Sequence, residues 1–319
     1  RRPSFIIGNV IALFWVVCAI LGDSITPHHP LDFRAKAHLA PSADYWFGTD
    51  KTGRDVFSRV LAGARDVLKI APLAALLGVL FGVILGLLMG YIGKRLDNVL
   101  SRIIEAFLAL PVVLIALLAI TTLGNSSWVV LAVVSTLFTP IVARTVRSAV
   151  MAERDLDYVT SAKLRGESTG FIMFREILPN VMGPIIVELT VRIGYAVFTI
   201  STLSFLGVGV ELGSPNWGSQ VADNYNMIFS GTWWSTIFPA GAIASLAIFP
   251  LIWIWTALLV ALVFAGGPAD VAPLTLHLSN LGGSLGSKWE NVAPAAVFSV
   301  IIPLAVFFSL QRYFVRGLL

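Results

Sequence analysis

Few side chains in this sequence could carry out catalysis or hold a metal ion. Three of the four histidines, His28, His29 and His38, share one polar stretch, but two neighbours and a distant third suit a tetrahedral metal poorly. Cys18 is the only cysteine, so neither an intramolecular disulfide nor a cysteine metal cluster can form. The sequence has no Gly-x-x-x-x-Gly-Lys-Ser/Thr loop for nucleotide phosphates. We therefore expect no catalysis, no cofactor and no metal site in this chain.

The composition indicates a membrane protein rather than a soluble domain. Hydrophobic residues make up 57% of the 319 residues and charged residues only 13%, whereas soluble domains carry about a quarter charged residues. The net charge is +4, and we expect the lipid bilayer, not nucleic acid, to be the chain's surroundings. The sequence predicts an all-α polytopic membrane protein.

Apolar runs long enough to cross a bilayer alternate with polar links. The predicted spans are 5–21, 70–92, 103–122, 128–143, 184–206, one that begins near 235, and 292–310. Lys94, Arg95 and Arg102 place the second link in the cytoplasm, and the link 207–234, which lacks Lys and Arg, lies outside. Six or seven transmembrane helices result, with Pro111 in the middle of the third and Glu105 in its first turn.

A polar segment, 148–180, separates the fourth and fifth spans on the cytoplasmic side. Leu156, Val159, Ala162 and Leu164 fall roughly on one helical stripe. Gly166 and Gly170 predict breaks, and Pro179 predicts the end of a second helix. A helix, a glycine bend and a second helix of this kind can dock into a groove on another protein.

The segment resembles the cytoplasmic coupling loop of ABC-importer permeases. The matching residues are Asp157–Ala162, Gly166 and Arg175–Asn180, although Thr160 and Ser161 stand where that family prefers Glu and Ala. The resemblance implies a type I ABC importer permease bundle in a bacterial-type plasma (inner) membrane. It assigns ATPase coupling to a run of nine residues: Tyr158, Val159, Thr160, Ser161, Ala162, Leu164, Arg165, Gly166 and Ser168.

A second resemblance narrows the branch. Residues 47–65, which include Gly48-Thr49-Asp50 and Gly53-Arg54-Asp55-Val56-Phe57-Ser58-Arg59, are similar to a signature of dipeptide, oligopeptide and nickel permeases. The likeness covers residues 1–248 and implies a second permease, two ATP-binding subunits and an extracytoplasmic substrate-binding protein as partners. We expect a first transmembrane helix (1–22), an extracytoplasmic segment (23–69) and a transmembrane domain (70–319). Within 23–69, Asp50 caps a turn and an amphipathic helix from Val56 to Ala64 lies on the membrane surface.

Two spans carry further patterns. Gly78, Gly82, Gly86 and Gly90 form one smooth ridge, which favours close packing against another helix over a substrate-lining role. In the fifth span, Glu188 and Arg192 can pair along the helix. The hydroxyls of Thr199, Ser201, Thr202 and Ser204 could line a wet pathway, or they could form hydrogen bonds between helices. We also expect Trp217, Trp233 and Trp234 to join an interfacial belt.

The C-terminal stretch 250–319 resembles a different branch, the sugar-importer permeases, through residues such as Phe307–Leu318. The run 235–264 is too long for one span and too short for two. A re-entrant hairpin near Pro250 would explain it, but we favour a composite of two permease sequences. Peptides are the expected cargo because the peptide-branch signatures cover most of residues 45–248, and a sugar or trehalose-type importer is the alternative through residues 250–319. A secondary transporter driven by an ion gradient is the alternative from another class, and it would need acids at the bilayer midplane.

Overall fold

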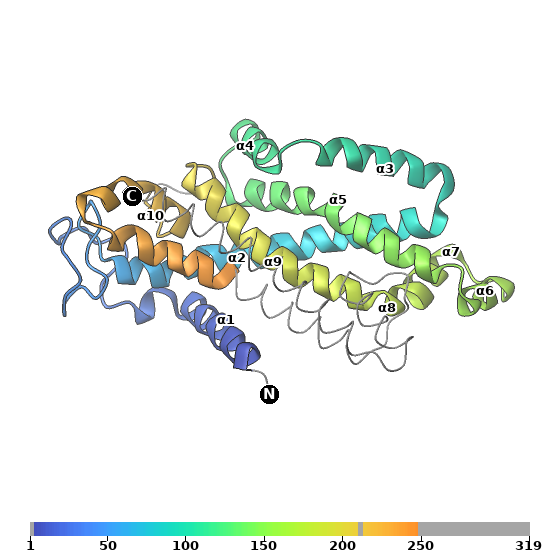
Figure 1. Cartoon of the computed structure of the whole chain (residues 1–319), viewed down its shortest axis with the longest axis horizontal. Coiled ribbons are helices and arrows are strands. Elements are labelled where there is room, and N and C mark those ends of the chain that lie inside the picture. Colours follow the sequence, from blue (N-terminus) through green and yellow to red (C-terminus); the bar gives the residue numbers. More distant parts are fainter. Residues whose placement is uncertain (1–2, 210–212, 248–319) are drawn as a thin grey trace, which may run out of the picture. The chain divides into compact units, whose positions relative to one another are not determined.

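The computed structural model describes residues 3–209 and 213–247, and their only regular structure is helical (Figure 1). The helices, in order, are α1 (Pro3–Leu21), α2 (Val56–Leu87), α3 (Lys94–Leu108), α4 (Val112–Leu123), α5 (Ser127–Glu153), α6 (Asp157–Leu164), α7 (Thr169–Phe171), α8 (Leu178–Asn180), α9 (Met182–Phe205) and α10 (Trp217–Asn224). Shorter turns are η1 (Gly22–Ile25), the π-helical turns η2 (Leu88–Ile92) and η3 (Ile172–Ile177), and η4 (Tyr225–Ser230). A further apolar helix spans Trp234–Ala247. The expected all-α fold is confirmed.

Among the described residues, three helices are long and apolar enough to cross a membrane: Val56–Ile92, Ser127–Glu153 and Met182–Phe205. The pair α3 and α4 would make a fourth, bent by 89°. Gly8–Leu21 and Trp234–Ala247 are shorter apolar helices. The predicted total of six or seven spans includes residues 292–310. That stretch and the C-terminal resemblance lie outside the described residues.

The expected surface helix before the second span is wrong. Val56 begins α2 itself, which with η2 runs 37 residues, about 55 Å at 1.5 Å per residue, against a hydrocarbon core of about 30 Å. The first turns therefore project beyond the lipid. Val56, Val60 and Ala64 are buried against protein, and Asp55 caps the helix by accepting hydrogen bonds from the backbone of Phe57 and Ser58.

The third predicted span is broken where Pro111 stands. The helix α3 ends at Leu108 and α4 begins at Val112 with Pro111 as its N-cap. Proline lacks an N–H and clashes with the preceding turn, so the backbone changes direction there. Glu105 consequently lies in the last turn of α3, not in the first turn of a span. The predicted span 103–122 with Pro111 in its middle therefore corresponds to parts of two helices that meet in a bend, not to one continuous helix.

The glycine ridge of α2 packs against α5, as predicted. A Cβ placed on Gly82 would lie 2.5 Å from the Cβ of Val142, and one on Gly86 would lie 2.6 Å from that of Val146. Gly78 and Gly90 meet Phe138 and Val150 in the same way. Both helices repeat every four residues along this seam, so the missing side chains let the two backbones approach closely.

A tryptophan at the outer end forms part of the core instead of an interfacial belt. Trp217 is fully buried, and its Nε1 donates a hydrogen bond of 2.8 Å to the carbonyl of Val60. Its ring meets Trp15 of α1 at a centroid distance of 4.8 Å. Trp233 is half exposed, and Trp234 donates to the carbonyl of Thr49 at 3.1 Å. The belt expectation fails for Trp217 because its indole N–H finds a protein partner.

Candidate functional site

The helix α6 ends in a tight cap at Gly166, at the end of the structure where α6 and α7 lie together (Figure 1). The N–H of Glu167 bonds the carbonyl of Ala162 at 3.2 Å, and the N–H of Gly166 bonds that of Lys163 at 3.0 Å. Gly166 adopts a φ of 77°, a conformation that glycine takes without a steric penalty. This is a Schellman cap, and it confirms the glycine bend.

The nine residues predicted to couple to the ATPase divide between a buried face and an exposed face. Val159 and Ala162 are fully buried and pack with Val146, Val150 and residues of η3. Leu164 is 85% exposed. The other predicted coupling residues that lie at the surface are Thr160, Ser161, Arg165, Gly166 and Ser168, while Tyr158 is half-buried. The buried pair therefore fixes α6 to its own chain, and the exposed group is available to a partner.

The part of the segment 148–180 that follows Gly166 differs from the prediction in two places. Gly170 lies inside α7 with an ordinary helical conformation, so it is not a break. Pro179 sits within α8, and the interruption comes at Val181, between α8 and α9. A side-chain contact ties the two arms together, because Arg165 donates to the Glu176 carboxylate at 3.0 Å. The segment is thus a braced unit and not an open loop.

Polar side chains also hold α6 to α5. The Tyr158 hydroxyl donates to the Glu153 carboxylate at 2.7 Å, and the Lys163 ammonium reaches the carbonyl of Arg154 at 3.4 Å. Burial, and after it the Glu153 carboxylate, raises the pKa of Tyr158, which therefore stays protonated as a donor. These contacts join α6 to α5, the membrane helix that precedes it.

Just before and at the start of α2, residues of the 47–65 signature form a charged cluster. The Asp50 carboxylate accepts hydrogen bonds from the Thr52 backbone at 2.8 Å and the Arg54 guanidinium at 2.7 Å, which confirms it as a turn cap. Burial alone raises the pKa of Asp50, but the Arg54 and Thr52 hydrogen bonds and the Arg54 charge outweigh burial and hold that pKa below its ordinary value. Arg59 is buried and donates to the Ser214 carbonyl at 3.0 Å.

This cluster joins two segments that are distant in sequence. The Lys51 ammonium pairs with Asp223 at 3.0 Å, and Gln220 donates to the carbonyl of Arg59 at 3.1 Å. Gly63 allows the contact, because a Cβ there would lie 2.3 Å from the Pro215 carbonyl oxygen. The structure therefore builds one subdomain from residues 28–63 and 213–234, which we name the outer subdomain because the sequence predicts both segments outside. Sequence analysis placed both segments outside but did not predict these contacts.

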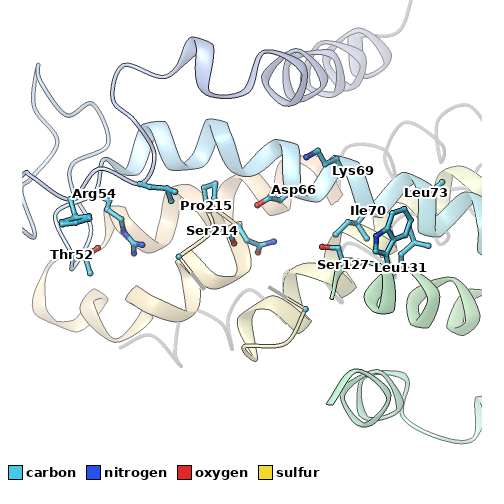
Figure 2. Close-up of a pocket in the computed structure, with 16 residues that line it drawn as sticks. Thr52, Arg54, Asp66, Lys69, Ile70, Leu73, Ser127, Leu131, Ser214 and Pro215 are labelled. Carbon is cyan, nitrogen blue, oxygen red and sulfur yellow. The ribbon is translucent and has the colours of Figure 1, made fainter. Parts of the chain in front are cut away.

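A cavity of about 1030 Å³ lies beside this subdomain. Figure 2 shows Arg54 at one end, Asp66 and Ile70 of α2 along one wall, and Ser127 of α5 and Ser214 on other sides. Leu73, Leu131 and Trp128 make much of the lining apolar. The volume lies near the upper end of the range for small-molecule sites.

The four hydroxyl residues of α9 that were predicted to line a pathway fall on different faces. Ser201 and Ser204 are buried and meet Gly218 of α10, where a Cβ would lie 2.2 Å from the Ser201 carbonyl oxygen and 2.7 Å from the Ser204 Cβ. Thr199 and Thr202 are half-buried on another side. Ser201 and Ser204 therefore lie in the contact between α9 and α10. Thr199 and Thr202 lie outside that contact. Glu188 and Arg192 form the predicted ion pair at 3.0 Å.

Comparison with known proteins gives consistent matches. Residues 82–253 match the family described as binding-protein-dependent transport system inner membrane component. The chain is 39% identical over 234 residues to a dipeptide transport system permease protein of Bacillus subtilis, covering 73% of each chain. It is 32% identical to a probable D,D-dipeptide transport system permease protein of Escherichia coli, covering 77% of this chain and 83% of the relative. It is also 32% identical to an oligopeptide transport system permease protein of Bacillus subtilis, covering 74% and 78%.

Proposed function

Because the chain belongs to the family of binding-protein-dependent transport system inner membrane components, whose members are multi-pass membrane permeases, we propose that it imports dipeptides and short oligopeptides. In this proposal it pairs with a second permease and receives peptide from an extracytoplasmic binding protein. Two separate ATP-binding subunits hydrolyse ATP. The relatives' peptide cargo supports the substrate class, and the two-faced coupling segment supports the mechanism.

That segment carries the mechanical part of the proposal. Its buried face, built on Val159 and Ala162, packs on α5 with little free space, so α6 and the end of α5 move together. Its outer face presents Leu164 together with the half-exposed Phe171 and Phe174. Closure of the ATP-binding subunits on nucleotide would push this surface. The push would tilt α5 and α9 between inward-open and outward-open arrangements.

Transport of radiolabelled dipeptide into proteoliposomes tests the cargo. The vesicles contain the full importer, and uptake is measured with the binding protein and with ATP inside, beside a disaccharide and a nickel salt as competing cargoes. Saturable dipeptide uptake that requires ATP supports the proposal. Uptake of the disaccharide or nickel alone would overturn peptide import, and uptake without the ATP-binding subunits would overturn ATP-driven transport.

Substitution of Leu164 by Asp tests the docking face. The substitution removes the hydrophobic contribution of Leu164 to the contact and places a carboxylate where the partner would exclude water. The ATP-binding subunits should therefore copurify at about a tenth of the wild-type amount or less. Phe229→Asp is the matched control, because Phe229 is 81% exposed and lies in η4, which follows α10 and is not part of the segment 148–180. Equal copurification of the two variants with the ATP-binding subunits would rule out docking at α6.

A further inference from the structure

One face of α9 carries a continuous polar stripe, which we define as Glu188, Arg192, Tyr195, Thr199 and Thr202. These residues follow one another at steps of four, three, four and three, so they lie above one another on one side of the helix. Tyr195 is 48% exposed, and Thr199 and Thr202 are half-buried. The side chains of Glu188 and Arg192 are only 14% and 11% exposed. The buried residues Ala196, Ile200 and Leu203 lie on a different face. The described part of the chain therefore leaves this stripe partly uncovered.

The stripe runs through the central part of a membrane-crossing helix. From Glu188 to Thr202 it extends about 21 Å at 1.5 Å per residue, within the 24 residues of Met182–Phe205, and Arg192 lies about 15 Å from the start of that helix. A guanidinium near the middle of a membrane-crossing helix faces a large desolvation penalty unless it is paired or hydrated. Such residues commonly mark ion or substrate pathways. Simple lipid exposure of this face is therefore energetically unfavourable.

The charged end of the stripe is held in place from α5. Glu188 receives a hydrogen bond of 2.8 Å from the Thr145 hydroxyl and pairs with Arg192 Nε at 3.0 Å. The Arg192 guanidinium carbon lies 5.7 Å from the Phe138 ring centroid and 5.2 Å from that of Tyr195. Two aromatic rings and one carboxylate thus fix its position. A guanidinium carries five N–H donors, and one carboxylate contact uses only part of that capacity.

We propose that the polar stripe of α9 lines the water-filled translocation pathway and that Arg192 contacts the α-carboxylate of the passing peptide. This inference rests on the proposed function for the identity of the cargo. A guanidinium and a carboxylate form strong charge-assisted hydrogen bonds. The neighbouring Glu188 keeps the site neutral, so it binds the carboxylate weakly enough to release it. Thr199 and Thr202 continue the path with hydroxyl groups.

Thiol accessibility tests the water-filled face. In the assembled importer, Cys18→Ala removes the only native cysteine, and Thr199→Cys and Tyr195→Cys then place thiols on the stripe. A hydrated thiolate attacks the sulfenyl sulfur of a membrane-impermeant thiosulfonate, which forms a mixed disulfide and releases sulfinate. Phe198→Cys is the matched control, because Phe198 is 60% exposed on the neighbouring apolar side of α9. Both stripe thiols should react at least about tenfold faster than the Phe198→Cys thiol, because a thiolate forms readily only in water.

Equal reaction rates at all three positions would overturn the pathway assignment. Thr199→Cys changes the side-chain volume little, so it provides the measurement if Tyr195→Cys fails to assemble. The wild-type importer is assayed in parallel for peptide uptake. If it takes up no peptide, the cargo proposal fails while the accessibility of the stripe is still decided by the thiol rates.

A second experiment tests the contact with the carboxylate. Initial uptake is compared for a dipeptide with a free carboxylate and for its C-terminal amide, both at saturating binding protein. Arg192→Gln should lower kcat/KM for the free acid by about tenfold or more, as expected for a lost charged hydrogen bond, and should change the amide's value much less. Arg192→Lys should recover part of the preference. An equal loss for both peptides would mean a structural role and would overturn the contact.

Discussion

Arg154, the residue that caps the C-terminal end of α5, donates a hydrogen bond of 2.9 Å from Nη1 to the carbonyl oxygen of Gly90 in η2. The carbonyl belongs to a π-helical turn, where the regular hydrogen-bond ladder of α2 is interrupted. The backbone carbonyl of Arg154 in turn accepts from Lys163 of α6 at 3.4 Å. One residue thus links α6, the helix proposed to dock the ATP-binding subunits, to α5 and to the end of α2.

Arg154→Gln should weaken the coupling between ATP hydrolysis and transport. The substitution removes a charged hydrogen bond, worth about 1.5–3 kcal/mol, so α6 can shift without moving α2. We expect fewer peptides transported per ATP in proteoliposomes, with near-normal binding of the ATP-binding subunits. Arg175→Gln, at an exposed arginine of the same segment, is the control. An unchanged peptide-to-ATP ratio in the Arg154→Gln importer would show that this link transmits no motion.

Gly86→Leu should destabilise the bundle. A Cβ at this position already lies 2.6 Å from the Val146 Cβ, and overpacking of a tight interface costs about 1–3 kcal/mol. The midpoint of thermal unfolding in detergent should therefore fall. Gly183→Leu serves as the control because its Cβ would meet no atom within 4 Å. A similar shift in both variants would contradict a packing role for the ridge.

Periodicity and turn chemistry were sufficient to predict three features. Gly166 ends α6, the glycine ridge packs on α5, and Glu188 pairs with Arg192. Each depends on residues close in sequence or on a regular repeat. The stripe of α9 was visible only in part, because the prediction grouped Thr199 and Thr202 with two buried serines. Hydroxyl content alone does not show which side of a helix meets a neighbour.

Long-range contacts explain the failures. Hydropathy predicted the lipid-facing part of α2, from residue 70 onward. It missed the buried start of the helix, which is stabilised by contacts with residues 213–217. A proline in the sequence does not by itself predict a helix break. Pro72 and Pro140 lie inside continuous helices, while Pro111 stands at a break. Neighbouring helices can compensate for the lost hydrogen bond of a transmembrane proline. The sequence does not show where such compensation is available.

The outer subdomain should lose stability in acid through Asp50. The pKa of Asp50 in the folded chain lies below its ordinary value, so its ionised form stabilises the fold at neutral pH, and this contribution disappears as the pH falls through the folded pKa. The protection factors for hydrogen exchange of residues 48–63 in the assembled importer should therefore fall below about pH 4, near the ordinary pKa of aspartate. Asp50→Asn leaves the buried Arg54 and Arg59 without this carboxylate, so exchange should already be fast at pH 7, consistent with a loss of about 3 kcal/mol or more. Asp44→Asn, at an exposed aspartate, should behave as wild type. Slow exchange in the Asp50→Asn importer at pH 7 would show that Arg59 is stabilised by its carbonyl contacts and Arg54 by Asp223 without the Asp50 carboxylate.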